Sequence, residues 1–546
     1  MSTATHDIVA KLWNLCNVLK DDGVTFHQYV IELTYLLFLK MAKETRTENQ
    51  LPEGYRWDNL EGQADSNRLK FYKGLLSHLG SHGSTLVKEI FADAYSSIKK
   101  DTTLSTLVTE IDKLDWYSAK REGLGDIYEG LLEKNANEKK AGAGQYFTPR
   151  PLIDSMVHVM RPTLEDIIQD PAAGTGGFLI AANRYIREHS DPDNWAEKQR
   201  RKYRCNTFYG MEHVQDTHRL ALMNLMLHGL DSDPQSAGIR YGDTLSPEGE
   251  ALPKASLILT NPPFGSKKGG GLPNRSDFEF PTSNKQFCFL QHIYLGLKPG
   301  GRAAAVFPDN VLFESNVGKQ IRADLMDKCN LHTILRLPSG IFYAQGVKTN
   351  VLFFTRGKKE KGNTKEVWVY DLRANTPQFG RRTSLMREHF AEFEAAFGDD
   401  PLGGSASLAQ RTDTGEEGRF RRFSRDWIAE RGDNLDISWL KDEREDDNGE
   451  LPEPAILAQE AMGELEAEAS RFCKSTWRLE IAATKPKSAC ADCLKTRVGG
   501  FSLYSPSTSS LWVICSYGML PTGSCYSPVA GNFARIGRGN QFVGTE

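Results

Sequence analysis

Membrane and export signals are missing from this 546-residue sequence. The strongest apolar stretch, Leu33 to Leu39, is far shorter than the roughly 20 residues that cross a bilayer. The N-terminus lacks the basic and then apolar pattern of a signal peptide, and nine cysteines are too few for a disulfide scaffold in a chain of this length. We therefore expect a cytoplasmic protein with no membrane partner.

A basic excess is also absent. Lysine and arginine number 67, aspartate and glutamate 71, and the formal net charge is -4. A protein that binds nucleic acid alone, through phosphates, usually has a marked positive charge. Any such contact here would depend on local basic surface, such as Arg356 to Lys361, or on another polypeptide. The alternative interpretation of Arg356 to Lys361 is a solvated loop.

The chain is too long for one ordinary core, so several domains are expected. Apolar residues at helical spacing predict a helical N-terminal domain over residues 1–134; they are Ile8, Leu12, Leu15 and Leu19, then Val30, Leu33, Leu37 and Met41. Residues 135–440 are predicted to form a catalytic domain.

From about Ile167, short apolar runs alternate with helical segments, which predicts a parallel sheet with crossover helices. The fold class is therefore α/β, with a doubly wound seven-stranded sheet whose ligands bind beyond the carboxyl ends of the strands. The candidate strands are Ile167–Gln169, Thr207–Met211, Ile239–Tyr241, Ser256–Thr260, Arg302–Phe307, Thr333–Arg336 and Asn350–Phe354.

The C-terminal part changes character twice. Residues 441–454 form an acidic linker, and residues 455–480 are predicted to form a helical extension that packs on a partner through Leu457, Ala461, Leu465 and Ala469. Residues 481–546 are expected to be a disordered or appended tail. Its cysteines, Cys490, Cys493, Cys515 and Cys525, match no standard zinc spacing, and histidine is absent there, so no metal is expected.

A glycine-rich loop follows the first candidate strand and opens a helix. Glycines let the backbone approach a nucleoside or amino-acid ligand closely, and the helix N-terminus can hold a carboxylate. A dinucleotide-binding fold or a tight turn would also fit this loop. Its candidate cofactor-binding residues are Asp170, Ala172, Gly174, Thr175, Gly176, Gly177 and Phe178.

Two acidic residues follow the next strands. Glu212 can accept both ribose hydroxyls of a nucleoside cofactor, although an exposed acid after a strand is an equally good interpretation of Glu212 alone. Asp243 is placed to accept from an adenine amino group, and its alternative role is to cap a turn or helix.

Asn261, Pro262, Pro263 and Phe264 directly follow an apolar strand and are the catalytic candidates. Consecutive prolines fix the backbone, so the asparagine projects rigidly. Adenine N6 is a poor nucleophile because its lone pair is delocalised into the ring. The Asn261 side-chain oxygen and the Pro262 carbonyl oxygen would bind its two hydrogens and localise the lone pair for attack on a sulfonium methyl group. Phe264 would stack on the flipped-out base; the alternative for the motif is a structural turn.

A hexapeptide upstream of the glycine loop supplies the remaining candidate cofactor-binding residues. Gln145, Tyr146, Phe147, Thr148, Pro149 and Arg150 precede an apparent helix over Pro151–Met160. Thr148 and the helix start would hold the amino-acid end of the cofactor, with Phe147 against its apolar part. Taken alone, the hexapeptide is a loop and a helix cap.

These motifs together resemble the modification (methyltransferase) subunit of type I restriction-modification systems, an N6-adenine DNA methyltransferase family. The match runs from about residue 6 to about residue 470 and includes Leu337–Phe342 and Tyr370–Thr376. The resemblance implies an S-adenosylmethionine-dependent fold, with the cofactor held by the segments matching Gln145–Arg150, Thr175–Gly177 and Glu212, and catalysis by Asn261–Phe264. It also implies double-stranded DNA, a specificity subunit and a second modification subunit as partners, and leaves a restriction subunit open.

Two other functions share parts of this pattern. A protein glutamine N5-methyltransferase would use the same Asn-Pro-Pro-aromatic chemistry, but it usually ends that motif in tyrosine and is shorter. A catalytically silent scaffold would bind cofactor and DNA only, and intact Asn261 and Phe264 argue against it. No GxxxxGK[ST] phosphate loop occurs, which excludes the translocating motor subunit of such a system.

Overall fold

The computed structural model describes residues 3–15, 26–114, 116, 148–230, 238–265, 271–342, 347–377, 379, 383–440, 503–504 and 512–513. It divides into two units, Met1–Asn448 and Gly449–Glu546. In the second unit, β10 (Leu503–Tyr504) pairs antiparallel with β11 (Trp512–Val513). The predicted linker, the predicted partner-binding helix and the rest of the tail lie outside the described residues.

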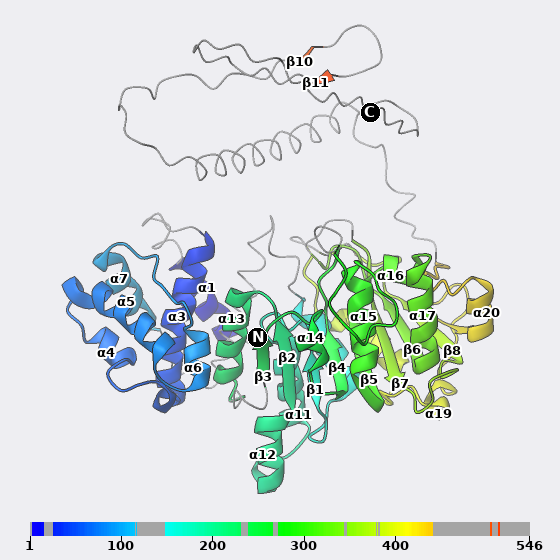
Figure 1. Ribbon diagram of the computed structural model, residues 1–546, viewed down its shortest axis with the longest axis horizontal. Helices are drawn as coiled ribbons and strands as arrows, with labels where there is room; N and C mark the ends of the chain where they lie inside the picture. The colour runs from blue at the N-terminus through cyan, green and yellow to red at the C-terminus, as the bar shows by residue number, and fades with distance from the viewer. Residues whose placement is uncertain are drawn as a thin grey trace. The chain divides into compact units, whose positions relative to one another are not determined.

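The first unit begins with helices, as predicted (Figure 1). The predicted stripe residues Leu12, Leu33, Leu37 and Met41 are fully buried in its core, because their helical spacing puts them on inward faces. The elements are α1 (Thr3–Asn14), α3 (Phe26–Thr45), η1 (Glu48–Gln50), α4 (Trp57–Glu61), α5 (Asp65–Ser81), α6 (Thr85–Ile90) and α7 (Asp101–Asp112).

One arginine joins this helical region to the sheet that follows. Arg219 lies on α13 (Gln215–Leu227) and donates to the carbonyl oxygens of Ile90, at 2.7 Å, and Ala92, at 2.6 Å. Its guanidinium also lies over the ring of Tyr35, 5.7 Å from the centroid. These contacts satisfy carbonyls at the end of α6, so the helices and the sheet share one packed core.

All seven predicted strands are present, and two further strands extend the sheet. The strands are β1 (Ile168–Asp170), β2 (Phe208–Glu212), β3 (Gly238–Tyr241), β4 (Ala255–Thr260), β5 (Leu297–Pro308), β6 (Cys329–Arg336), β7 (Thr349–Arg356), β8 (Glu366–Asp371) and β9 (Phe420–Ser424). Their spatial order is β3-β2-β1-β4-β5-β7-β6-β8-β9. β7 and β9 run antiparallel to their neighbours, and the other pairs are parallel.

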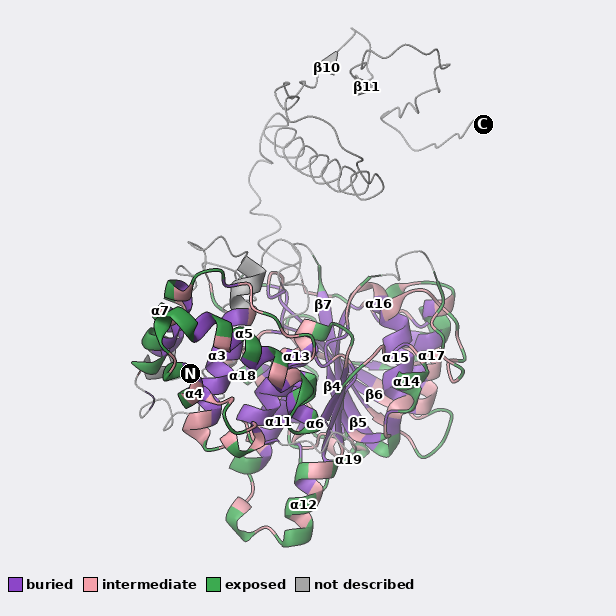
Figure 2. Cartoon of the chain, turned by 60° about the vertical axis from the view of Figure 1, so that its left-hand side comes forward, coloured by how far each residue is buried: buried purple, intermediate pink, exposed green. Residues whose placement is uncertain are grey.

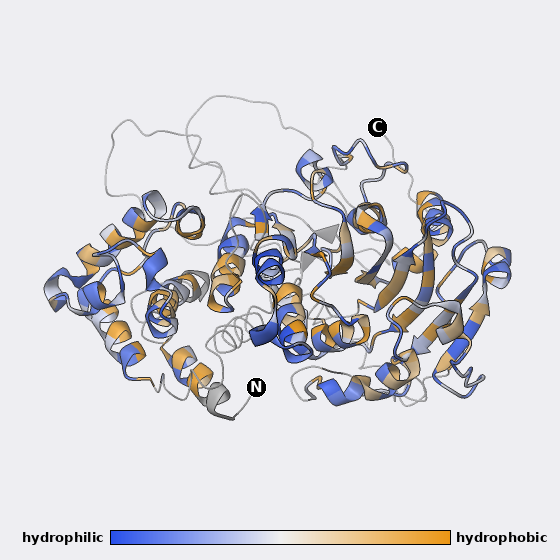
Figure 3. Cartoon of the chain, turned by 90° about the horizontal axis from the view of Figure 1, so that it is seen from below, coloured by the Kyte–Doolittle hydropathy of each residue, from blue (hydrophilic) through white to orange (hydrophobic). Residues whose placement is uncertain are grey.

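Helices cover both faces of this sheet, as the doubly wound prediction requires. Leu257 and Leu259 of β4 pack into the hydrophobic cluster that holds α10, α11 and α13, whereas Ile258 packs into a second cluster with α15 and α17. This alternation follows from the two-residue repeat of a strand. The strands are mostly buried (Figure 2) and mostly hydrophobic, and the hydrophilic residues lie on the outer helix surfaces (Figure 3).

The helices around the sheet are mostly short. They are α10 (Arg150–Met160), α11 (Gly177–Glu188), η3 (Pro192–Asn194), α12 (Glu197–Asn206), α13, α14 (Pro247–Glu250), α15 (Lys285–Gly296), α16 (Asn310–Phe313), α17 (Val317–Lys328), η4 (Arg387–Phe390), α18 (Ala391–Phe397), α19 (Ser405–Leu408) and α20 (Arg425–Glu430). Across the described parts of the chain, no helix combines the length and apolar character needed to cross a membrane.

Candidate active site

The glycine-rich loop lies where the strand order reverses, between β1 and its neighbours β2 and β4. Gly174 has φ +56° and Gly176 has φ +84°, backbone conformations that side chains other than glycine rarely adopt. Gly176 is the residue before α11, so the loop turns directly into the helix N-terminus. The sequence therefore needs glycine at both positions to bring backbone amides to this edge of the sheet.

Glu212, at the end of β2, is tied to that loop. Its Oε2 accepts from the backbone N–H of Gly174 at 2.9 Å, and its Oε1 accepts from the N–H of Val214 at 2.8 Å. Burial raises the pKa of Glu212, and these backbone hydrogen bonds oppose the rise. Each carboxylate oxygen keeps a second lone pair, so the group can still accept hydrogen bonds from a ligand.

Asp170, the last residue of β1, is the other buried acid of the site. Its side chain caps the following turn, with Oδ1 accepting from the N–H of Ala172 at 3.1 Å. Complete burial raises the pKa of this carboxyl to about 7, and the nearby charge of Glu212 adds to the rise. A group that titrates near neutrality inside a ligand pocket is a signature of functional sites.

Asn261 follows β4 and is buried, with 8% of its surface exposed. Its Nδ2 donates to Thr148 Oγ1 at 2.9 Å, which joins the end of β4 to the start of α10 across 113 residues of sequence. Its Oδ1 is buried and accepts no hydrogen bond. A buried acceptor without a partner costs free energy, and such atoms in native proteins commonly face a ligand or catalytic partner.

A small pocket at this edge collects nine of the predicted site residues. It brings together the hexapeptide, the glycine loop and the catalytic motif; its lining is Thr148, Arg150, Ile153, Asp170, Ala172, Ala173, Gly174, Thr175, Gly177, Phe178 and Asn261. Ile153 and Ala173 were not predicted. Pro149, Gly176, Glu212, Asp243 and the segment Pro262–Phe264 do not line it. Gln145, Tyr146 and Phe147 lie outside the described residues.

Phe264 is half-buried beside a second aromatic ring. Its ring meets that of Phe342 edge to face, with centroids 6.3 Å apart and planes at 75°. The residue after it, Gly265, accepts from the N–H of Lys285 at 3.2 Å, which fixes the loop against the start of α15. The two prolines therefore stand in a segment that is held at both ends.

Asp243 lies in the turn after β3. Its Oδ1 accepts from the N–H of Leu245 at 2.9 Å, and its carbonyl accepts from Ser246. This is the capping arrangement that the sequence left open as an alternative. The second carboxylate oxygen remains available for a ligand.

Three residues near the site were missed from the sequence. Arg275, whose side chain is 2% exposed, donates to the Thr244 carbonyl at 2.6 Å and to both carboxylate oxygens of Asp277, at 2.7 and 2.8 Å. It thereby links the segment after the catalytic motif to the loop after β3. Val214, just beyond β2, and Tyr241, the last residue of β3, are 53% and 58% exposed. An apolar side chain at the end of a strand was the only available signal.

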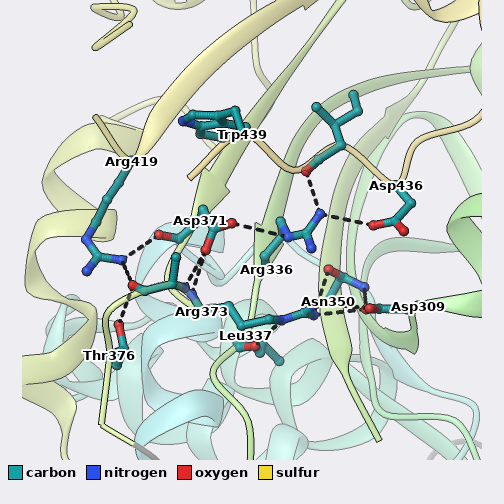
Figure 4. Close-up of polar contacts among 12 residues, drawn as sticks. Asp309, Arg336, Leu337, Asn350, Asp371, Arg373, Thr376, Arg419, Asp436 and Trp439 are labelled. Atoms are coloured by element: carbon teal, nitrogen blue, oxygen red, sulfur yellow. Dashed lines mark hydrogen bonds and ion pairs between the residues drawn. The ribbon is translucent and has the colours of Figure 1, made fainter. Parts of the chain in front are cut away.

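The motifs around Leu337 and Asp371, which carry part of the family resemblance, are joined by a network of hydrogen bonds and ion pairs (Figure 4). Arg373 donates to both oxygens of Asp309, at 2.8 and 2.9 Å, and to the carbonyls of Leu337, at 3.0 Å, and Thr349, at 2.9 Å. Arg336 pairs with Asp371 at 3.4 Å and Asp436 at 3.0 Å. Buried arginines with paired carboxylates hold the carboxyl ends of β5, β6 and β8 together. These motifs thus shape the edge of the sheet.

Two other features lie apart from the motifs. The basic run at Arg356 follows β7, whose antiparallel direction puts it at the opposite edge of the sheet, and Arg356 pairs with Glu360 at 2.8 Å. A larger cavity of about 1110 Å³ is lined by Tyr370, Arg411 and Phe420 among others and contains no residue predicted for catalysis or cofactor binding. Within the described ranges, no cluster of three or more His, Cys, Asp or Glu could hold a metal ion.

Comparison with known proteins shows what this arrangement belongs to. Residues 119–447 match the N-6 DNA Methylase family and residues 8–111 match the HsdM N-terminal domain. The chain is 50% identical over 492 residues to the StySPI methylase subunit of Salmonella potsdam and to the EcoKI methylase subunit of Escherichia coli K12, both type I restriction enzyme subunits; each match covers 84% of this chain and 93% of the relative. The chain belongs to the type I restriction enzyme methylase subunits.

Solved structures agree with this assignment. The EcoKI M protein is 46% identical, with a TM-score of 0.52 over 87% of this chain and 96% of that one. A chain from a study of assembly and conformational transition of the type I R-M system is 25% identical, with a TM-score of 0.65 over 88% of this chain and 99% of that one. The methylase subunit is therefore an adenine-N6-specific DNA methyltransferase that uses S-adenosylmethionine as methyl donor.

Proposed function

We propose that Asn261 Oδ1 and the main-chain carbonyl oxygen of Pro262 accept the two hydrogens of the target adenine amino group. The buried Oδ1 without a partner carries this assignment, because the adenine N–H would supply the hydrogen bond that it lacks. Both acceptors favour a tetrahedral nitrogen, which localises the lone pair in the transition state. The donor bond from Asn261 to Thr148 keeps the oxygen facing the base.

Phe264 is proposed to stack on the extrahelical adenine. Its ring is held edge to face by Phe342 and stays half-exposed, which leaves a ring surface for the base. A base that undergoes chemistry must leave the duplex, and stacking on an aromatic ring offsets part of the lost base stacking.

The residues at the pocket fit S-adenosylmethionine, which supplies an electrophilic methyl group on its sulfonium. The glycine loop and the start of α11 would hold the amino-acid end, together with Thr148, Arg150 and the residues Gln145–Phe147. Glu212 would accept from the ribose hydroxyls, and Asp243 from the adenine amino group. The exposed apolar surfaces of Val214 and Tyr241 would flank the adenine ring.

Cofactor affinity is expected to rise with pH through the ionisation of Asp170. The cofactor is cationic, so it binds the ionised carboxylate better, and the pKa of about 7 means that this form is scarce at acidic pH. Affinity should increase about tenfold per pH unit below pH 7 and level off above it. Titration calorimetry of S-adenosylmethionine from pH 5.5 to 7.5 measures this. Asp170→Asn should bind more weakly with a flatter profile; a wild-type profile without a slope would contradict the assignment.

The partners follow from the family. Type I methylase subunits work with a specificity subunit and DNA, and we propose that two copies of this chain join one specificity subunit in the cytoplasm, with a restriction subunit added in the full system. Separate family matches for residues 8–111 and 119–447 support two domains. We propose residues 1–134 as the helical N-terminal domain and residues 135–440 as the catalytic domain. Residues 455–480 are proposed to bind the specificity subunit.

Transfer of labelled methyl from S-adenosylmethionine tests the proposed function directly. The subunit with its specificity subunit should methylate duplex DNA at adenine N6, and the subunit alone should show little site-specific transfer, since the formal charge of -4 gives weak DNA binding by itself. Label in protein glutamine, with none in DNA, would favour the alternative methyltransferase. Cofactor binding without any transfer would favour a silent scaffold.

A further inference from the structure

Exposed apolar side chains gather at the carboxyl edge of the sheet. Among the described residues, the large ones at these strand ends are Val214, after β2, Tyr241, the last residue of β3, Phe313, after β5, and Val347, before β7. Val214 and Tyr241 belong to the cofactor side. Phe313 ends the short helix α16, next to α17 (Figures 1 and 2), and is 46% exposed.

The turn that carries Phe313 is rigidly held from behind. Val311 and Leu312 are 0% and 1% exposed. The buried Arg322 guanidinium donates to the carbonyls of Val311, at 3.1 Å, and Glu314, at 2.8 Å, and the N–H of Leu435 donates to the Leu312 carbonyl at 2.9 Å. With its neighbours fixed inward, the phenylalanine ring has to point outward. An exposed aromatic on a fixed backbone loses little conformational freedom when it binds.

A short chain of hydrogen bonds connects this turn to the catalytic motif. Glu314 Oε2 accepts from Asn284 Nδ2 at 3.3 Å, and the side chain of Asn284 caps the start of α15. The first residue of α15, Lys285, donates its N–H to Gly265, the residue after Phe264. Phe313 and Phe264 therefore lie on hydrogen-bonded segments at the same edge of the sheet.

The surroundings of Phe313 suit nucleic acid. Ser315, Asn316 and Lys319 are exposed beyond it, and Lys348 is exposed where its carbonyl accepts from the N–H of Asp309, the residue before α16. The acid Asp309 is paired with Arg373. Exposed lysines and polar groups around an aromatic ring match phosphates around a base.

We propose that Phe313 lodges in the duplex beside the target adenine and stabilises the gap that the flipped base leaves. The inference rests on the proposed function of Asn261–Phe264. Apolar side chains inserted at a base step can replace part of the stacking that flipping removes, and base-aromatic stacking changes affinity by roughly tenfold for one residue. Phe264 would then hold the adenine outside the duplex while Phe313 occupies the space inside it.

Base flipping by the complex with its specificity subunit tests this role. The probe is a duplex with the site that the wild-type complex methylates, carrying 2-aminopurine in place of the target adenine, with S-adenosylhomocysteine bound. Phe313→Ala should reduce the fluorescence increase on binding and raise the KM for DNA roughly tenfold, with cofactor affinity unchanged. Phe313→Trp should restore both. The control is Leu402→Ala, which also removes an exposed apolar side chain and should behave as wild type. Leu402 lies at the opposite edge of the sheet, where its main-chain carbonyl accepts from the Thr355 hydroxyl.

Three outcomes would overturn the role. If the wild-type complex transfers methyl and Phe313→Ala shows the wild-type fluorescence increase and KM for DNA, only this inference is contradicted. Weaker association of the specificity subunit on size-exclusion chromatography, with an unchanged KM for DNA in the assembled complex, assigns Phe313 to a protein interface. A wild-type complex that binds the duplex and transfers no methyl group contradicts both the proposed function and this inference.

Discussion

Replacement of Asn261 by alanine is expected to lower the rate of methyl transfer by about 100- to 1000-fold, while S-adenosylmethionine still binds. The side-chain oxygen is a buried acceptor that the adenine amino group would satisfy, and removing one preorganised hydrogen-bonding group from a transition state typically costs two to three orders of magnitude. The buried Nδ2 bond to Thr148 would be lost too, which loosens the loop. Single-turnover transfer of labelled methyl, alongside calorimetry of cofactor binding, measures both properties.

Two further variants separate chemistry from folding. Asn261→Asp keeps an acceptor oxygen, and the Thr148 hydroxyl can donate to the other, so we expect more residual transfer than in the alanine variant. Asn194→Ala removes an exposed asparagine from η3 and should leave transfer unchanged. Transfer within a few fold of wild type in Asn261→Ala would exclude the proposed mechanism.

Replacement of Glu212 by alanine is expected to weaken S-adenosylmethionine binding by about 100-fold or more. Hydrogen bonds to a charged acceptor contribute about 1.5–3 kcal/mol each, and the ribose offers two hydroxyls. The change also leaves the N–H groups of Gly174 and Val214 without their acceptor, so the glycine loop should lose order. Calorimetry measures the affinity, and thermal unfolding measures the stability.

The loss of cofactor affinity, compared with the loss of stability, distinguishes a cofactor ligand from a residue that only holds the glycine loop. Glu212→Gln retains one carbonyl oxygen for a backbone N–H and should bind the cofactor better than the alanine variant does. Glu188→Ala removes an exposed acid from the far end of α11 and should affect neither property. Loss of stability in Glu212→Ala without loss of cofactor affinity would make the residue a brace only.

The central strands of the fold could be predicted because their signal is local. β4 and the second half of β5, Ala303–Phe307, are mostly apolar runs, as expected for strands covered by helices on both faces. β9 was missed because its sequence, Phe420–Ser424, holds only two apolar residues, three positions apart, without the two-residue alternation of a half-buried strand. An edge strand needs little more apolar surface than that. β8 contains an apolar run, but its last two residues belong to the motif Tyr370–Thr376, and no turn signal separates the strand from that motif.

The site residues that could be predicted are those that lie at the end of a strand in the sequence. Asp170, Glu212 and Asn261 all stand where a strand ends, and parallel strands bring their carboxyl ends to one edge. Arg275 stands in an irregular segment and Phe313 ends the short helix α16, and the importance of both comes from what folding brings beside them. Arg275 meets the Thr244 carbonyl, and the buried Arg322 lies behind the turn of Phe313. No spacing in the sequence encodes such contacts.

The fixed orientation of the Asn261 amide also determines which bases other than adenine the enzyme can methylate in error. Its nitrogen is engaged by Thr148, so the atom that meets the substrate is an oxygen. Guanine and thymine present an oxygen at the equivalent position, which would leave two acceptors facing each other, whereas the exocyclic amino group of cytosine offers two hydrogens just as adenine does. We therefore expect the products of off-target methylation to consist of N4-methylcytosine and to contain no O-methylated bases.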